Sequence, residues 1–215
     1  MHVVITGASR GIGEGLARRF RDRGDRVTAT STKGGDGLVA LDVTQPDSIK
    51  AFAEAVEGPV DLLICNAGVY LDKGQALEGG FDAATWAQTM AVNVAGPFLS
   101  VQALLPKLRA SALAGKVAII ASAMGSQARA PGGSYIYRAS KAAVVNVGRN
   151  LAADLAADGI AVGVYHPGWV QTDMGGAGAD IDTATSTAGL IRRFDALSPA
   201  TTGCFEAWDG APIPF

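Results

Sequence analysis

The chain has 215 residues, of which 48% are hydrophobic and 18% are charged, and its formal net charge is −2. That length suits one large α/β domain and leaves no room for a second full domain. The small negative charge and a pI near 5.6 argue against a nucleic acid or an anionic membrane surface as a partner. Cys65 and Cys204, the two cysteines, lie in apolar runs, so we expect buried thiols rather than a disulfide scaffold.

The first strand is expected at residues 3–5, and the first glycine turn follows at Gly7. This spacing leaves no space for a signal peptide, and no apolar run approaches the length expected of a membrane span. We therefore expect a cytoplasmic protein without a membrane partner.

Apolar runs and helical patterns alternate along the rest of the chain. The expected strands are residues 3–5, 26–30, 38–41, 60–65, 117–121, 160–165 and 204–207. The expected helices are residues 12–23, 47–56, 85–108, 134–157 and 183–197, with a candidate kink at Pro97. The alternation predicts an α/β fold, namely a single-domain, Rossmann-type, doubly wound parallel sheet of about seven strands with helices on both faces.

Residues 1–215 are expected to form this one domain, because neither an internal repeat nor a linker interrupts the alternation. Within it, we expect residues 1–110 mainly to bind a dinucleotide. Residues 111–215 are expected to carry the catalytic residues and the substrate loop.

A glycine-rich turn, TGASRGIG at residues 6–13, lies between the first strand and the first helix. Only in this context does such a turn indicate phosphate binding. Gly7 permits the tight exit from the strand, Gly11 lets backbone approach a pyrophosphate, and Gly13 lets helix and sheet pack closely. The free N–H groups and the dipole of the helix then face an anion. The alternative is a plain strand–turn–helix without a ligand.

The end of the second strand indicates which dinucleotide binds. An NAD-binding fold usually places an acid about 20 residues after the glycines, where it binds the ribose 2′-OH. Residues 30–33 read TSTK and contain no acid. Arg10 and Lys33 supply positive charge and Ser31 supplies a hydroxyl, all suited to a 2′-phosphate. We predict NADP(H) as the preferred cofactor and NAD(H) as the alternative, unless Arg10 and Lys33 are merely solvated surface charges.

Tyr137 and Lys141 are four residues apart, so a helix places them on one face with about 5–6 Å between their Cβ atoms. A cation that close lowers the pKa of a tyrosine from its usual value of about 10. Ser122 follows the strand at 117–121 and so lies at a carboxyl end, where ligands bind in open α/β sheets. We predict that Tyr137 protonates a forming alkoxide, Lys141 tunes it and Ser122 holds the carbonyl, beside a bound nicotinamide.

Each of these residues also has an ordinary structural explanation. A serine at a strand end is often a cap, and a helical tyrosine usually packs in a core. Tyr135 is a competing proton donor, but it lies on another helix face and has no lysine four residues further on. The joint occurrence of serine, tyrosine and lysine behind a dinucleotide turn favours catalysis.

Further motifs complete the pattern: Asn-Ala-Gly at 66–68, Pro-Gly at 167–168, the run at 166–176 and the run at 209–215. With these motifs, nearly the whole chain resembles a short-chain dehydrogenase/reductase, of the C-factor-like and sniffer-like carbonyl reductase branch. The resemblance implies that Asn93 completes a tetrad with Ser122, Tyr137 and Lys141 through a water molecule.

The resemblance also implies which residues contact the cofactor. Asp42 and Val43 would contact the adenine, residues 66–68 would line a ribose, Lys141 would hold the nicotinamide ribose, and residues 167–172 would frame the carboxamide. The full expected cofactor-binding set is Gly7, Ser9, Arg10, Gly11, Ile12, Gly13, Ser31, Asp42, Val43, Asn66, Ala67, Gly68, Tyr137, Lys141, Pro167, Gly168, Val170 and Thr172. For Asn66, a hydrogen bond that braces the sheet is an equal alternative.

The substrate side differs from the common family pattern in two places. The segment between Ser122 and Tyr137 is slightly longer than usual, and the loop after Thr172 is short and rich in Gly and Ala. We expect an open pocket bordered by Trp169. His166 is interpreted as structural, and two histidines with two cysteines predict no metal site.

The leading hypothesis is an oxidoreductase that interconverts a carbonyl and an alcohol, with a small and rather apolar ketone or aldehyde as substrate. The alternative is a dinucleotide-binding signalling or sensor protein of C-factor type with little turnover, because the resembled branch includes developmental signalling proteins. The intact serine–tyrosine–lysine set favours the enzyme. The resemblance further implies a homodimer or homotetramer formed through the helices at 85–108 and 134–157.

Overall fold

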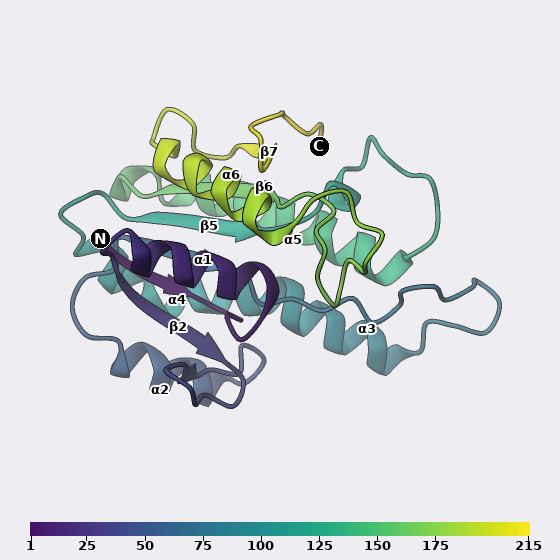
Figure 1. Cartoon of the computed structure of the whole chain (residues 1–215), viewed down its shortest axis with the longest axis horizontal. Helices are drawn as coiled ribbons and strands as arrows, with labels where there is room; N and C mark the ends of the chain where they lie inside the picture. Colours follow the sequence, from purple (N-terminus) through teal and green to yellow (C-terminus); the bar gives the residue numbers. More distant parts are fainter.

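The computed structural model describes residues 1–215 and contains one seven-stranded sheet (Figure 1). The strands are β1 (His2–Ile5), β2 (Arg26–Ser31), β3 (Val39–Ala40), β4 (Leu62–Cys65), β5 (Lys116–Ile120), β6 (Ala161–His166) and β7 (Phe205–Ala207). Their order is β3-β2-β1-β4-β5-β6-β7, and every neighbouring pair is parallel. The order reverses between β1 and β4, which confirms the doubly wound, Rossmann-type fold expected from the sequence.

The helical elements are α1 (Gly11–Asp22), α2 (Pro46–Ala55), α3 (Ala83–Met90), η1 (Ala91–Ala95), α4 (Gly96–Arg109), η2 (Ala123–Gly125), α5 (Tyr135–Asp154), η3 (Ala156–Asp158) and α6 (Thr183–Ala196). The largest difference from the expected elements concerns the helix at 85–108. A five-residue π-helical turn, η1, interrupts it before the candidate kink at Pro97. Pro97 instead occupies the first turn of α4, where its missing N–H is not needed.

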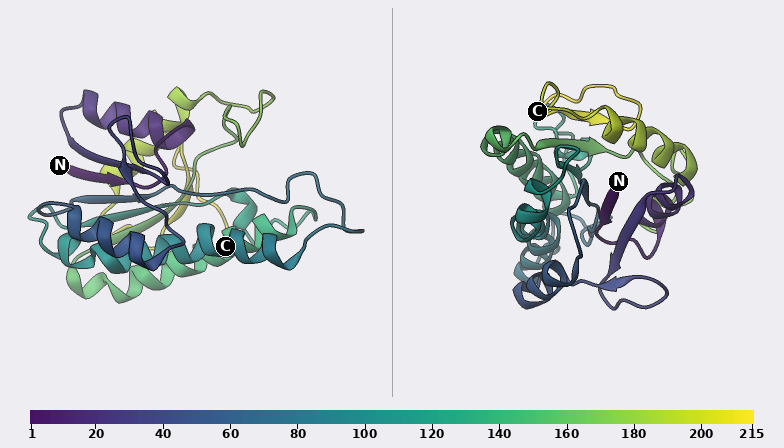
Figure 2. Two further views of the ribbon diagram at one scale, coloured as in Figure 1. Left: turned by 90° about the horizontal axis from the view of Figure 1, so that it is seen from below. Right: turned by 90° about the vertical axis from the view of Figure 1, so that its left-hand side faces the viewer.

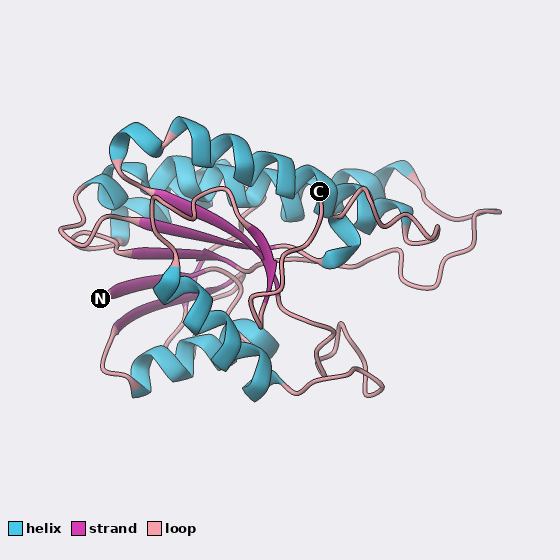
Figure 3. Ribbon diagram, turned by 90° about the horizontal axis from the view of Figure 1, so that it is seen from above, coloured by secondary structure: helices cyan, strands magenta, loops and turns pink.

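Helices cover both faces of the sheet (Figures 2 and 3). On one face, α1 and α6 pack side by side, and Val3 and Ile5 of β1 are buried with Leu16 of α1 and Phe194 of α6. On the other face, the intervening Val4 belongs to a second cluster with side chains of α2, α4 and α5. Alternate residues of one buried strand therefore serve two cores, as expected for a parallel sheet covered on both sides.

The helical stretch Ala83–Arg109, formed by α3, η1 and α4, has 27 residues. By length and composition it is long and apolar enough to cross a membrane, so the expectation that no apolar run reaches that length was wrong. In this fold Val101, Leu104 and Leu108 are buried in the core beneath the sheet, where α4 contacts β4 and β5. Packing against a buried parallel sheet accounts for these three residues, whereas Phe98 of the same helix is exposed.

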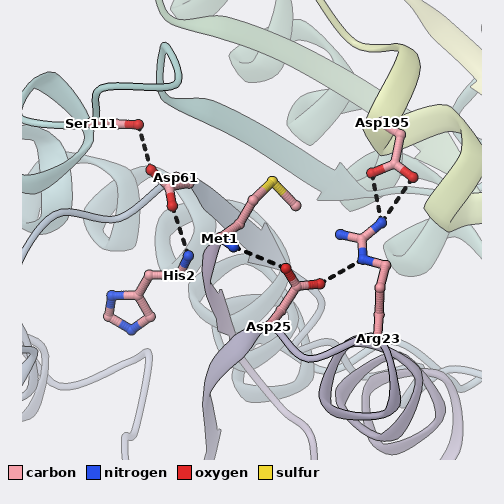
Figure 4. Close-up of polar contacts among 7 residues, drawn as sticks. All are labelled: Met1, His2, Arg23, Asp25, Asp61, Ser111 and Asp195. Atoms are coloured by element: carbon pink, nitrogen blue, oxygen red, sulfur yellow. Dashed lines mark hydrogen bonds and ion pairs between the residues drawn. The ribbon is translucent and has the colours of Figure 1, made fainter.

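The amino ends of the strands are held by paired polar side chains (Figure 4). Asp61, just before β4, accepts hydrogen bonds from the His2 backbone N–H at 2.7 Å and from the Ser111 hydroxyl at 2.6 Å. These two bonds connect the starts of β1 and β4 to the loop that leads from α4 into β5. Hydrogen bonds to an ionised carboxylate are among the stronger ones in proteins.

A second carboxylate at this end connects β1 to α1 and α6. Asp25 accepts from the Met1 amine at 2.9 Å and from Arg23 at 2.6 Å, and Arg23 also bonds to Asp195 (Figure 4). Burial disfavours the ionised form of Asp25, but the hydrogen bonds from Met1 and Arg23 outweigh burial and hold its pKa below the usual value. The amino edge is therefore a region of satisfied charge.

Candidate active site

Ser122 and Tyr137 meet in one cavity at the carboxyl edge of the sheet. β5 ends at Ile120, Ser122 begins the short turn η2, and Tyr137 lies in the first turn of α5. The cavity has a volume of about 530 Å³, and Tyr70, Met124 and Trp169 also line it. Its location is the one expected for a ligand in an open α/β sheet.

The two tyrosines at the start of α5 occupy different environments. Tyr137 is 7% exposed and its ring stacks on Tyr70, with 4.1 Å between centroids, whereas Tyr135 is 42% exposed and lies edge-on to Phe81. Only Tyr137 lines the cavity. The choice of Tyr137 over Tyr135 therefore agrees with the side-chain geometry.

Ser122 is placed for both roles considered from the sequence, the cap of a turn and a residue of the site. Its hydroxyl accepts a hydrogen bond from the Met124 N–H at 3.2 Å, so it caps η2. The same side chain lines the cavity with Tyr137, and Ser122 works to lower the pKa of the phenol. A cap and a partner of the tyrosine are thus compatible roles for one side chain.

Lys141 is buried one helical turn beyond Tyr137. Its Nζ donates to the carbonyl oxygen of Ile120 at 3.0 Å and lies 5.6 Å from the centroid of the Tyr137 ring. Burial lowers the pKa of Lys141 to about 8. The ammonium therefore remains mostly charged at neutral pH, at the end of β5 and near the phenol.

The expectation that Lys141 makes Tyr137 acidic does not hold in this structure. Burial dominates and raises the pKa of Tyr137 to about 12. Tyr70 and Asp72 add to the rise, and Ser122 opposes it. The physical reason is that the phenolate loses hydration in the buried site, while the Lys141 ammonium interacts with the ring and with a carbonyl. Tyr137 is protonated at neutral pH.

Asn93 lies in the π-helical turn η1, and its side chain is fully bonded. Its Oδ1 accepts from the Val69 N–H at 2.8 Å, and its Nδ2 donates to the Val69 carbonyl at 2.9 Å and to the Ser140 hydroxyl at 3.0 Å. A Cβ added to Gly68 would lie 3.4 Å from Asn93 Oδ1 and 3.7 Å from Lys141 Nζ. Asn93 and Lys141 thus flank Gly68, and Asn93 holds the backbone that follows β4.

The glycine turn is pressed against the Asn-Ala-Gly segment. Gly7 has φ +67°, and a Cβ there would come within 2.7 Å of the Ala67 backbone; one on Gly13 would meet the Gly7 carbonyl at 2.3 Å. Asn66 donates from Nδ2 to the carbonyl of Gly7 at 2.7 Å and to that of Thr6 at 3.1 Å. Asn66 therefore braces the glycine turn. This agrees with the alternative interpretation, in which Asn66 makes a bracing hydrogen bond.

The residues expected to contact the adenine occupy structured positions. The Asp42 carboxylate accepts from the backbone N–H of Thr44 at 2.9 Å and from its hydroxyl at 2.7 Å, which forms a turn before α2. Val43 is buried in the core and packs against Gly96 of α4. These contacts stabilise the fold locally, and a contact with adenine remains a prediction.

The charges expected to bind a 2′-phosphate lie at the surface. Arg10 forms an ion pair with Asp173 at 2.9 Å, with the two side chains 77% and 76% exposed, and Lys33 is exposed. The Ser31 hydroxyl accepts from the Gly34 N–H at 3.0 Å. The partner of Arg10, Asp173, comes from the loop between β6 and α6, and the sequence did not indicate this contact.

The segment at 167–176 forms one wall of the cavity. Pro167, Gly168, Val170 and Thr172 line it, and Val170 forms a bridge with Ile181. Trp169 borders the cavity, as expected, and its indole N–H donates to the carbonyl of Gly175 at 3.0 Å. This bond closes the loop on itself across the Gly-rich turn.

His166 also lines the cavity, at the end of β6. Its Nδ1 is buried without a hydrogen-bond partner. Burial lowers the pKa of His166 to about 4, and the positive charge of Arg129 adds to the effect. The imidazole is therefore neutral at physiological pH.

Sequence reasoning missed three residues that follow the Asn-Ala-Gly motif. Tyr70 stacks on Tyr137, Asp72 accepts hydrogen bonds from the start of α5, and Lys73 donates to the carbonyl of Met174 at 2.9 Å. The available signal was their position, because a segment directly after β4 lies at the carboxyl edge. Nothing in the spacing of these residues indicates that Tyr70 and Asp72 contact the start of α5 or that Lys73 contacts the loop after β6.

The sheet order, the glycine turn and the carboxyl-edge cavity define a dinucleotide-binding α/β protein. The short chain dehydrogenase family model matches residues 1–180. The chain belongs to the short-chain dehydrogenase/reductase family of NAD(P)-dependent oxidoreductases.

Curated relatives and solved structures place the chain near the expected branch. It is 42% identical to C-signal of Myxococcus xanthus over 169 residues, which cover 78% of this chain and 100% of the relative. It is 35% identical to 1-hydroxy-2-glutathionyl-2-methyl-3-butene dehydrogenase of Rhodococcus sp. (strain AD45) over 225 residues, with 97% and 96% coverage.

Two carbonyl reductases are similar in structure along the whole chain. The NADPH-bound carbonyl reductase from chicken fatty liver has a TM-score of 0.91 at 28% identity, covering 100% of this chain and 98% of the other. Carbonyl reductase Sniffer of D. melanogaster has a TM-score of 0.91 at 26% identity, covering 100% and 99%. The resemblance to the C-factor-like and sniffer-like branch is confirmed.

Proposed function

We propose that this chain is an NADP(H)-dependent oxidoreductase that interconverts a ketone or aldehyde with the corresponding alcohol. The observation that carries the proposal is the convergence of Tyr137 and Ser122 in one carboxyl-edge cavity, with the Lys141 ammonium buried beside the phenol. A proton donor, a second hydrogen bond for the oxygen and a fixed positive charge are what stabilisation of a forming alkoxide requires.

The glycine turn fits the pyrophosphate of a dinucleotide. No side chain caps the first turn of α1, so its N–H groups are free for an anion, and the close approach of Gly7 and Gly13 keeps the turn compact. The residues that would hold the cofactor are those at 7–13, 66–68 and 167–172, together with Lys141. A bound nicotinamide supplies the hydride.

Tyr137 acts as the general acid. Because its pKa is about 12, it carries its proton at neutral pH and can donate it to the carbonyl oxygen as negative charge develops there. Ser122 provides the second hydrogen bond and orients the carbonyl. Lys141, with a pKa of about 8, retains most of its charge at neutral pH and stabilises the phenolate left after proton transfer.

The cavity wall favours an apolar substrate. Trp169, Met124 and Met174 line it, and Trp169 and Met174 are exposed at its rim. Carbonyl reductases are also among the similar structures, including one that is NADPH-bound. A modest ketone or aldehyde with an apolar substituent suits these side chains.

A second candidate is a dinucleotide-binding signalling protein of C-factor type with little turnover. The identity of 42% to C-signal favours it. The two candidates share the cofactor site and differ in whether Tyr137 transfers a proton.

The test follows NADPH and NADH oxidation by the purified protein against a panel of ketones, aldehydes and quinones. We expect turnover with apolar carbonyls, and a loss of about 10²–10⁴-fold in Tyr137→Phe. Tyr135→Phe is the matched control, because Tyr135 is exposed and does not line the cavity; it should retain turnover. Unchanged turnover in Tyr137→Phe would remove the mechanism, and tight NADPH binding without turnover would favour signalling.

A further inference from the structure

The first turn of α5 has no local cap. Ser134, which precedes it, has φ +48°, and its side chain makes no capping bond. The N–H groups of the first turn therefore need an acceptor from elsewhere, because a helix leaves them without intrahelical partners. This turn contains Tyr137. The group that accepts hydrogen bonds from its N–H groups therefore also sets the position of the proposed proton donor.

The acceptor is Asp72, from the loop that follows β4. Its Oδ2 accepts from the Ile136 N–H at 2.9 Å, and its Oδ1 accepts from the Tyr137 N–H at 3.2 Å. The residue is completely buried. These bonds span 64 and 65 positions of the chain, so the carboxylate connects two segments that local sequence could not join.

We propose that Asp72 is a positioning residue, whose buried carboxylate fixes the first turn of α5 and thereby holds the Tyr137 phenol at the end of β5. The inference rests on the proposed role of Tyr137 and adds a residue to that site. Asp72 acts through the backbone of Tyr137 and touches neither the phenol oxygen nor a reacting atom.

Neighbouring contacts show that the loop as a whole serves this purpose. The Tyr70 ring stacks on the Tyr137 ring, and the Tyr70 hydroxyl is hydrogen-bonded to the Ser134 hydroxyl. Val69, one residue earlier, is held by Asn93 through its backbone N–H and carbonyl. Asp72 thus fixes the backbone of Tyr137 while Tyr70 fixes its ring.

The choice of a carboxylate is informative, because burying an ionised group without a cation is unfavourable. A neutral serine, threonine or asparagine would also satisfy N–H groups at a helix start. The positive end of the α5 dipole offsets part of the burial penalty for an anion. Asp72 also acts electrostatically on the neighbouring Tyr137 phenol.

Tyr137 is the titratable group on which this charge acts. The ionisable groups around it are Tyr70 and Asp72 from the loop after β4, Lys141 on α5, and His166 and Lys73 at the cavity wall. Asp72 is one of the groups that raise the pKa of Tyr137, and neutral His166 contributes no charge at physiological pH. Asp72 consequently favours the protonated phenol, the form that donates to a carbonyl.

The test compares Asp72→Asn, Asp72→Ala and the control Asp82→Asn. Asp82 also caps a helix, accepting from the Thr85 N–H at 2.9 Å, but it is exposed and lies at the start of α3. Two readouts are needed: the titration of Tyr137 by ¹³C NMR of labelled tyrosine, assigned with Tyr137→Phe, and the pH profile of carbonyl reduction. The NMR readout does not require turnover, so it separates this inference from the proposed function.

Asp72→Asn keeps one of the two acceptor oxygens and removes the charge. In this variant we expect Tyr137 to titrate at lower pH and the alkaline limb of the reduction rate to move with it. In Asp72→Ala, we expect a loss of kcat of about tenfold to a hundredfold from misplacement of the phenol. Asp82→Asn should change neither readout. The proposal is overturned if Asp72→Asn leaves the Tyr137 titration where it is, or if Asp72→Ala lowers only the Tm.

Discussion

At the amino ends of the strands, Asp61 receives two hydrogen bonds, Asp25 is paired with the Met1 amine and Arg23, and the Lys116 ammonium donates to two carbonyls. At the carboxyl ends, the Lys141 ammonium has one carbonyl, and Nδ1 of His166 has no partner. Both regions are polar and partly buried, yet the Lys141 ammonium and the His166 ring have fewer hydrogen-bond partners than the charged groups at the amino edge.

This contrast separates stability from function within one sheet. A paired group contributes to the free energy of unfolding through its own bonds. An isolated buried charge lowers that free energy and persists only because the rest of the fold holds it in place. We therefore expect substitutions at the amino edge to destabilise the protein without loss of chemistry, and substitution of Lys141 at the carboxyl edge to do the opposite.

The sharpest test is Lys141→Met. The pKa of Lys141 falls from 10.5 to about 8 on folding, which corresponds to a cost of about 3 kcal/mol at neutral pH. After about 1 kcal/mol for the bond lost to the Ile120 carbonyl, we expect a gain of about 2 kcal/mol in the free energy of unfolding. Turnover should fall by about 10²-fold or more. Urea unfolding and NADPH oxidation measure the two effects.

Lys116→Met is the matched control, because Lys116 begins the same strand, β5, at whose end the Lys141 ammonium lies. The Lys116 ammonium donates to the carbonyls of Phe194 and Asp195 at 3.2 and 3.0 Å and is only half-buried. We expect unchanged turnover and no gain in stability. If Lys141→Met gains no more stability than Lys116→Met, the two lysines do not differ in the way described.

Asp61→Ala tests the amino edge. It removes the acceptor of the His2 N–H and the Ser111 hydroxyl, and we expect a loss of about 2–3 kcal/mol in the free energy of unfolding. Asp61→Asn, which keeps one acceptor oxygen, should lose less. Once folded, both variants should have wild-type kcat, and a kcat lowered tenfold would show that this edge reaches the active site.

His166 tests the carboxyl edge through pH. Its pKa is about 4 in the folded protein and 6.5 in the unfolded chain, so between these values the unfolded chain binds more protons. The stabilising contribution is thus present above pH 6.5 and is lost as the pH falls towards 4. Thermal melts of His166→Asn should show a flatter decline of Tm over this range than wild type. An identical decline would mean that His166 is not kept neutral by burial.

The fold was predictable because its signal is local. Runs such as 60–65 and 117–121 are too apolar for anything except buried strands, and the glycine turn at 6–13 fixes their connection to α1. Tyr137, Lys141 and Ser122 were accessible for a similar reason, since helical spacing and strand ends determine where they point. Asp72 was not, because its partners are 64 and 65 residues away and no spacing rule connects a loop to a helix start.

The pKa of Tyr137 was mispredicted for a physical reason. The spacing of Tyr137 and Lys141 gives a distance but not the depth of burial, and burial outweighs the attraction of the ammonium. The π-helical turn η1 was also not predicted. It contains Asn93, whose hydrogen bond with Val69 in the loop after β4 is not indicated by the sequence pattern. Such contacts arise only when the sheet has assembled.

The smallest expected effect concerns the exposed charges beside the glycine turn. Arg10→Ala removes a guanidinium suited to a 2′-phosphate, and we expect the KM for NADPH to rise about tenfold while that for NADH changes little. Asp173→Ala is the matched variant, because it breaks the same ion pair and leaves Arg10 in place. It should keep or improve NADPH binding, and its stability should change by less than about 1 kcal/mol because both side chains are exposed. An equal rise of KM for NADPH and NADH in Arg10→Ala would show that Arg10 holds the loop that carries Asp173 and does not select the cofactor.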